Sequence, residues 1–167
     1  PLIVNPHGGP YGIRDVWGFN PEAQFFANRG YATVQVNFRG SGGYGKAFQQ
    51  AGYGGKWGAE MQNDITDTVN HLVKKGIVDP EKICIYGASY GGYATVAGLA
   101  FTPELYKCGI NYVGVTDVSL LFESMPKHWE TQKELLKIQI GDPDDEALMK
   151  RMSPLHHVEK IVAPLMI

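Results

Sequence analysis

The chain has 167 residues, 44% of them hydrophobic and 19% charged, which suits one globular domain with one core. Its 15 basic and 17 acidic residues give a formal charge of -2, so charge offers no basis for binding nucleic acid or an anionic membrane. No apolar run approaches the roughly 18 residues that span a bilayer. The chain opens without Met or a leader, so the true N-terminus is expected elsewhere, and both a cytoplasmic and a periplasmic location stay open.

Apolar periodicity and turn residues predict strands that alternate with helices. Strands are expected at residues 2–5, 31–38, 82–87, 108–115 and 164–167, and helices at 21–29, 59–75, 90–101, 118–125, 131–139 and 144–151. This order predicts a largely parallel sheet with helices on both faces, in one α/β domain over residues 1–167. Because the last predicted strand stops after four residues, we expect the sheet to be incomplete at its C-terminus.

The chain offers little that could bind a metal. Cys84 and Cys108 lie in two predicted strands. Two cysteines are too few to indicate a disulfide framework or a zinc site. We expect both to be small buried thiols, with a bridge or a reactive role as the alternative. The acidic residues at 142–146 are typical of a polar helix start. No metal and no cofactor is therefore expected.

A G-x-S-x-G pattern occupies residues 87–91, between the strand-like KICIY and the helical YATVAGLAF. This setting is that of a nucleophile elbow, the sharp turn of an α/β-hydrolase fold. The turn should place Ser89 at the carboxyl edge of the sheet as a nucleophile, in strained backbone geometry. The amide of Tyr90 would then face an oxyanion from the start of a helix. The alternative is an N-cap serine followed by glycines that serve packing.

A second motif, HGGP, directly follows the first predicted strand. Hydrolases of this kind place their other oxyanion donor after that strand, where glycine lets a backbone amide approach the substrate. Either Gly8 or Gly9 could donate, and Gly9 is favoured. His7 precedes the serine in the chain, so we interpret it as a residue that shapes the site and not as the base.

Taken together, HGGP, NFRGSGGYG, GASYGGY and SPLHHVEKIVAPLMI resemble the prolyl oligopeptidase family of serine peptidases across nearly the whole chain. The acylaminoacyl-peptidase and dipeptidyl-peptidase branches are the most similar, and HGGP favours the former. The resemblance implies a Ser–Asp–His triad with Ser89 as nucleophile, Tyr90 as one oxyanion amide and Gly8 or Gly9 as the other. It also implies short peptide or acyl-peptide substrates and an N-terminal β-propeller that these residues do not encode.

The resemblance further implies that the pocket for the substrate side chain lies partly after the strand at 108–115. The residues placed there are Val115, Val118 and Leu121. No firm motif supports this assignment.

The acid and the base of the triad are not evident in the chain. In the family both follow the strand that begins at PLMI, so they are expected beyond Ile167. Asp117, with His156 or His157, has the required order and is the alternative. His71 and His128 are expected at the surface. A serine without its base is a poor nucleophile, so we expect these 167 residues alone to be nearly inactive.

Three other interpretations stay open. An elbow and an oxyanion hole suit any acyl transfer, so a carboxylesterase or lipase is one alternative. A binding protein that kept the fold without catalysis is the second. The third concerns the chain itself, because a fragment with an unfinished sheet should expose an edge and self-associate.

Overall fold

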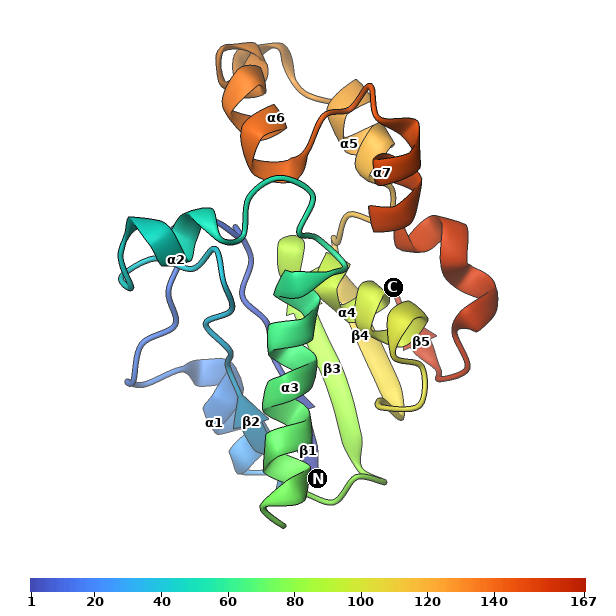
Figure 1. Cartoon of the computed structure of the whole chain (residues 1–167). Coiled ribbons are helices and arrows are strands. Elements are labelled where there is room, and N and C mark those ends of the chain that lie inside the picture. The colour runs from blue at the N-terminus through green and yellow to red at the C-terminus, as the bar shows by residue number, and fades with distance from the viewer.

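The computed structural model describes residues 1–167, which form one five-stranded sheet in the order β2-β1-β3-β4-β5 (Figure 1). The strands are β1 Leu2–Val4, β2 Ala32–Val34, β3 Ile83–Ala88, β4 Cys108–Tyr112 and β5 Leu165–Met166. Every neighbouring pair is parallel. The predicted parallel α/β fold is thus confirmed, although the strands are shorter than expected, most of all β2.

The helices follow the predicted order, with additions. They are α1 Pro21–Ala27, α2 Lys46–Gln50, α3 Glu60–Lys74, α4 Tyr90–Phe101, α5 Val118–Glu123, α6 Lys133–Ile140 and α7 Glu146–Met152, with 3-10 helices η1 Lys127–Gln132 and η2 Pro154–Lys160. The five-residue α2 was not predicted, because so short a helix shows no apolar period. None of the helices combines the length and the apolar character that crossing a membrane requires.

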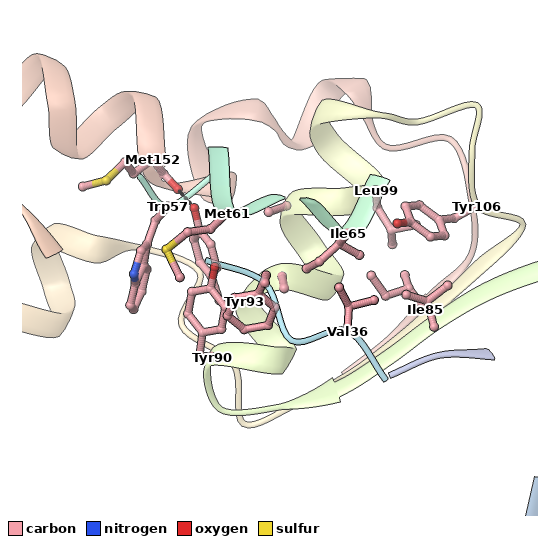
Figure 2. Packing of buried hydrophobic residues seen from close by; sticks show 14 of the residues in the cluster. Val36, Trp57, Met61, Ile65, Ile85, Tyr90, Tyr93, Leu99, Tyr106 and Met152 are labelled. Carbon is pink, nitrogen blue, oxygen red and sulfur yellow. Dashed lines mark hydrogen bonds between the residues drawn. The ribbon is translucent and has the colours of Figure 1, made fainter. Parts of the chain in front are cut away.

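The main core lies on the face of the sheet that α3 and α4 cover (Figure 2). From α3, Met61, Ile65 and Val69 point inward at helical spacing and are fully buried. Residues 90–100 of α4 are all buried, because this helix packs against β3 and β4 of the sheet and also contacts η2 and α3. Small side chains on α4 allow that close packing. The helix that carries the candidate nucleophile is therefore fixed along nearly its whole length.

The opposite face of the sheet is covered only in part, by α1. No residue of α1 is fully buried, although Phe26 packs edge-on against Tyr86 of β3. On the neighbouring strand β4, Ile110 and Tyr112 are exposed. Helices therefore lie on both faces, but one face is much less packed than the other.

The two cysteines form a disulfide, so the expectation of free buried thiols was wrong. Cys84 of β3 and Cys108 of β4 are direct partners in the parallel register, and their Cα atoms lie 4.8 Å apart. Both side chains point to the partly covered face and are half-buried. Composition could not reveal the bond. The two cysteines are 24 residues apart in sequence, and they meet only because of the register between β3 and β4.

Residues 118–152 form a layer over the carboxyl ends of the strands, which we call the lid segment (Figure 1). It contains α5, η1, α6 and α7. Its packing is uneven, because α5 and α7 each place two residues in the core, whereas η1 has no buried residue and Ile140 is the one buried residue of α6. The lid segment therefore covers the end of the sheet at which β3 connects to α4.

Candidate active site

Ser89 occupies the turn between β3 and α4, as the motif predicted. Its backbone has φ 56° and ψ -120°, a conformation that a residue with a side chain rarely adopts. The amide of Ser89 donates to the carbonyl of Tyr112 on β4 (3.0 Å), which ties the turn to the next strand. The Ser89 side chain is exposed and makes no capping bond to α4. Its hydroxyl is therefore free to meet a substrate.

Close backbone packing imposes this turn. A Cβ at Gly91 would lie 2.2 Å from the carbonyl oxygen of Pro6, and one at Gly87 would lie 2.5 Å from the backbone of Gly91. Real Cβ atoms do not approach so closely, so only glycine fits at either position. The end of β1, the elbow and the first turn of α4 are thus locked together.

Two backbone amides without acceptors flank Ser89. Tyr90 is the first residue of α4, so its amide has no acceptor within the helix. Gly9, in the loop after β1, has an amide that donates to nothing in the protein. Both residues line the same cavity as Ser89. Gly8 is also adjacent, since a Cβ there would lie 3.5 Å from the Cβ of Ser89. Gly9 is more exposed than Gly8 and, unlike Gly8, it lines the cavity.

A cavity of about 250 Å³ opens beside Ser89. The loop after β1 and the residue Trp57 form one side, and the lid segment forms the other. It is mostly apolar, and no charged side chain lines it. The lining residues are Gly9, Pro10, Tyr11, Trp57, Ser89, Tyr90, Val115, Leu121, Met125, Trp129, Gln132, Leu136, Gln139 and Ile140.

The residues assigned to a pocket from the resemblance divide into two groups. Val115 and Leu121 line the cavity. Val118 does not, because its side chain is fully buried in the core and its amide donates to the hydroxyl of Ser153 (2.9 Å). The reason is helical phase: Val118 and Phe122, one turn apart in α5, both face the core, which turns Leu121 toward the cavity.

Tyr11 joins the lid segment to the body of the domain, a role that the sequence did not reveal. Its hydroxyl donates to the carbonyl of Gln139 in α6 (2.7 Å) and accepts from the indole nitrogen of Trp57 (2.9 Å). Burial raises the pKa of this hydroxyl above its ordinary value, so it stays protonated and keeps donating. The partners lie 46 and 128 residues away, and only its place beside HGGP could have drawn attention to Tyr11.

The RGSGGYG loop is fixed by an ion pair. The guanidinium of Arg39 binds both carboxylate oxygens of Asp64 on α3, at 2.8 and 2.6 Å, and the Arg39 amide donates to the same carboxylate (2.8 Å). Because the guanidinium forms two hydrogen bonds to one carboxylate, the ion pair fixes the orientation of the loop relative to α3 as well as holding it there. The loop residue Ser41 is thereby held under the loop that carries His7, and the hydroxyl of Ser41 lies 2.9 Å from the His7 ring.

None of the alternative acid or base residues hydrogen-bonds to Ser89 or lines the cavity beside it. Asp117 caps α5, where its carboxylate accepts from the amides of Ser119 and Leu120. His157 packs against Phe101, at the far end of α4, roughly 16 Å along the helix axis from the elbow.

The remaining histidines are no closer to that role. His156 is exposed on η2, His128 is exposed on η1 and His71 is exposed on α3. No group of three metal-ligating side chains occurs in the structure, and Asp145 of the acidic run caps α7.

A parallel sheet with a serine elbow at its carboxyl edge is the arrangement of α/β-hydrolase proteins. Comparison with known families agrees, because residues 17–167 match the family described as "Prolyl oligopeptidase family". The chain belongs to this family.

Individual relatives cover the whole chain. Dipeptidyl aminopeptidase BIII of Pseudoxanthomonas mexicana is 42% identical over 100% of this chain and 24% of its own length. The acylamino-acid-releasing enzyme of Arabidopsis thaliana is 28% identical over 98% of this chain and 22% of its own. Both branches expected from the motifs are therefore represented, with greater identity to the dipeptidyl peptidase.

Solved structures agree with the fold. A puromycin-hydrolyzing peptidase of Mycobacterium tuberculosis superposes with a TM-score of 0.89 at 31% identity, covering 99% of this chain and 24% of that one. An acylaminoacyl peptidase in complex with Z-Gly-Gly-Phe-chloromethyl ketone gives 0.86 at 34% identity, covering 99% and 26%. The chain thus spans about a quarter of the length of the relatives it matches.

Proposed function

We propose that Ser89 is the nucleophile of a serine peptidase that cleaves short peptides through an acyl-enzyme. The observation that carries the proposal is the exposed Ser89 hydroxyl on a strained turn, between two amides without acceptors and at the edge of an apolar cavity. In this scheme the Ser89 oxygen attacks the scissile carbonyl, and the amides of Gly9 and Tyr90 bind the oxyanion that forms. The amine leaves, and water then hydrolyses the acyl-enzyme.

The proposal assigns the base and the acid to residues outside 1–167. Its support is that Asp117 is engaged as a helix cap and that His157 lies at the far end of α4. Residues 1–167 alone are then expected to retain only oxyanion and binding effects. In comparable triad knockouts these effects leave a residual rate enhancement of roughly 10³–10⁴-fold over the reaction in water.

The cavity is proposed to hold the side chain that precedes the cleaved bond. An apolar cavity of about 150 Å³ is large enough for benzene, so the 250 Å³ here can take a large apolar or aromatic side chain. Without a charged lining residue, an Asp, Glu, Lys or Arg side chain would be buried unpaired, at a cost of several kcal/mol. The inhibitor in the related acylaminoacyl peptidase structure carries a Phe, which supports this preference.

A β-propeller in the full-length protein is a further part of the proposal. Its support is the family membership together with relatives about four times as long as this chain. Such a domain would restrict access to short peptides. We therefore expect the full-length protein to cleave only short peptides, and this preference for short substrates to be lost when the β-propeller is removed.

The test is intact-mass analysis after incubation with a fluorophosphonate, on the full-length protein, on its Ser89→Ala variant and on residues 1–167. Labelling of the full-length protein at Ser89, with none on the other two, is the expected result. Equal labelling of residues 1–167 would contradict the assignment of the base. No labelling of any of the three would favour a hydrolase-shaped binding protein.

Substrate class is tested separately on the full-length protein. Aminoacyl- and acylaminoacyl-nitroanilides with Phe before the cleaved bond should be hydrolysed with higher kcat/KM than short esters. Faster turnover of the esters would favour a carboxylesterase. Among nitroanilides, replacing Phe by Lys should lower kcat/KM by at least tenfold, because the lysine charge finds no partner in the cavity.

A further inference from the structure

A second cavity, also of about 250 Å³, adjoins the elbow and the loop after β1. Gly8 and Ala88 line it, and each is the chain neighbour of a residue that lines the first cavity, Gly9 or Ser89. A Cβ at Gly8 would lie 3.2 Å from the carbonyl oxygen of Ala88 and 3.5 Å from the Cβ of Ser89, so the loop and the elbow are in contact. The second cavity therefore begins within one residue of the proposed nucleophile.

This cavity lies on the face of the sheet opposite α4. Side chains alternate along a strand, so Tyr86 and Ala88 of β3 share one face, and Tyr112 of β4 pairs with Ala88 in the parallel register. Phe26 of α1 packs against Tyr86 on the same face. Glu22 of α1 lines the cavity together with Tyr86 and Tyr112. We call it the α1 cavity, because it is formed between α1 and the carboxyl ends of β3 and β4 (Figure 1).

Glu22 gives the α1 cavity a negative charge, whereas no charged side chain lines the first cavity. No Lys or Arg lines the α1 cavity. The Oε1 atom of Glu22 accepts from the hydroxyl of Tyr86 (3.0 Å), which holds the carboxylate against the sheet. Burial, reinforced by this carboxylate, raises the pKa of the Tyr86 hydroxyl, so it stays protonated and keeps donating. Glu22 takes part in none of the five ion pairs of the structure, so its charge is unpaired.

The groups around Glu22 suit a basic side chain. A Lys ammonium has three donors and an Arg guanidinium has five, and neither group can accept. The second carboxylate oxygen of Glu22 and the hydroxyl of the exposed Tyr112 can accept from them. The Tyr112 ring can also attract a cation to its face. A further negative charge lies nearby, because the Nε2 atom of Gln35, which lines the cavity, donates to the carboxylate of Asp15 (3.4 Å). An acidic side chain would therefore be repelled.

Under the proposed function, the two cavities receive the two halves of the substrate. The side chain before the cleaved bond occupies the first cavity, so the leaving peptide must depart from Ser89 in another direction. A strand rises about 3.3 Å per residue, which places Tyr86 roughly 10 Å from Ser89, and an extended substrate rises by the same amount. The Glu22 carboxylate, next to the Tyr86 hydroxyl, is thus within reach of a long side chain on the first or second residue after the cleaved bond.

We propose that the α1 cavity receives a Lys or Arg side chain from the leaving peptide, with Glu22 as its partner. The inference rests on the proposed function and deepens it, since it specifies a residue after the cleaved bond in addition to the apolar residue before it. Because Glu22 is exposed and water screens the pair, we expect a preference of about 3- to 10-fold and not an absolute requirement.

The experiment measures kcat/KM of the full-length protein for short peptides with Phe before the cleaved bond. The first or the second residue after the bond is Lys, norleucine or Glu, because norleucine keeps the apolar length of lysine without its charge. Lys should exceed norleucine by about 3- to 10-fold at one of the two positions, and Glu should fall below norleucine there. Added salt should shrink this preference, since salt screens partly exposed charges.

Variants of Glu22 separate its charge from the shape of the cavity. Glu22→Gln should abolish the preference for Lys, and Glu22→Lys should reverse it in favour of Glu. Tyr86→Phe should weaken it, because the carboxylate loses the donor that holds it. Glu104→Gln, at an exposed carboxylate in the loop after α4, is the matched control and should leave the preference unchanged. An unchanged preference in Glu22→Gln, or equal kcat/KM for Lys and norleucine in the wild type, would overturn the inference.

Phe-nitroanilides distinguish this inference from the proposed function. They have no amino acid after the cleaved bond, so Glu22→Gln should leave their kcat/KM unchanged. An equal loss on nitroanilides and on Lys peptides would show that Glu22 supports the fold, which would also overturn the inference. A wild type that hydrolyses neither nitroanilides nor peptides would contradict the proposed function itself. Hydrolysis of both without a charge preference would contradict only the role of the α1 cavity.

Discussion

The elbow and the lid segment form two sides of one site, yet they are built in opposite ways. At the elbow, Gly87, Tyr90 and Gly91 are buried, and backbone contacts to Pro6 and Tyr112 fix the turn. In the lid segment, α5 and α7 each place two residues in the core, whereas η1 has no buried residue and α6 has one. Because a fixed scaffold commonly carries the chemistry while weakly packed segments adapt, we infer that, under the proposed function, the elbow sets reactivity and the η1–α6 part of the lid segment sets substrate choice.

The largest expected effect falls on the elbow. Gly91→Ala places a Cβ against the Pro6 carbonyl, a backbone atom that cannot move aside cheaply. We expect a loss of more than about 3 kcal/mol in the free energy of unfolding, measured by urea titration. Gly18→Ala is the control, because a Cβ there meets nothing within 4 Å and the change should be small. Similar stability of the two variants would contradict the rigid elbow.

A second effect tests the strands below the elbow. Reducing the Cys84–Cys108 bond, or replacing both residues by Ser, should destabilise the chain by about 3 kcal/mol, as expected for closing a loop of this length. Urea titration with and without dithiothreitol measures the difference. The double Ser variant serves as the control, since the reductant should not affect it. A reductant-insensitive wild type would show that the thiols are free.

Tyr11 lies where the two regions meet, so Tyr11→Phe tests their connection. The substitution leaves the indole nitrogen of Trp57 without an acceptor, which should cost about 1–3 kcal/mol. It also removes one of the two donors to the Gln139 carbonyl, which still accepts from the Gly54 amide (2.9 Å). Hydrogen exchange should quicken at α6 and stay constant at α4. Tyr31→Phe, at an exposed site, is the matched control. Faster exchange in both helices would mean that the lid segment is not an independent unit.

The smallest effect on stability is expected in the lid segment itself. Trp129 is 41% exposed and lines the cavity, so Trp129→Ala should change the free energy of unfolding by less than about 0.5 kcal/mol. In the full-length protein, kcat/KM for substrates with Phe before the cleaved bond should fall about tenfold, with a smaller loss for Ala. Trp17→Ala, fully exposed outside the cavity, provides the comparison. Equal losses of kcat/KM for Phe and Ala substrates would show that Trp129 does not contribute to substrate selectivity.

The elbow could be predicted from sequence because its determinants are local: a strand, a serine between glycines, and a helix. The strand order and the disulfide could not, because β3 and β4 are paired by register and not by any local pattern. The position of Val118 was missed because the sequence did not reveal the phase of α5, in which Val118 faces the core and Leu121, three residues later, faces the cavity. Tyr11 and Trp57 were missed for a related reason, since their partners lie far away in the chain.

The strained turn at Ser89 also sets function against fold. With φ 56° and ψ -120°, this position suits glycine better than any residue with a Cβ. Selection for stability alone would therefore favour Ser89→Gly, a variant that should be more stable and, under the proposed function, inactive. The chain carries at this one position a residue that its backbone disfavours. A gene released from selection for catalysis would be free to lose that serine while the protein folded better than before.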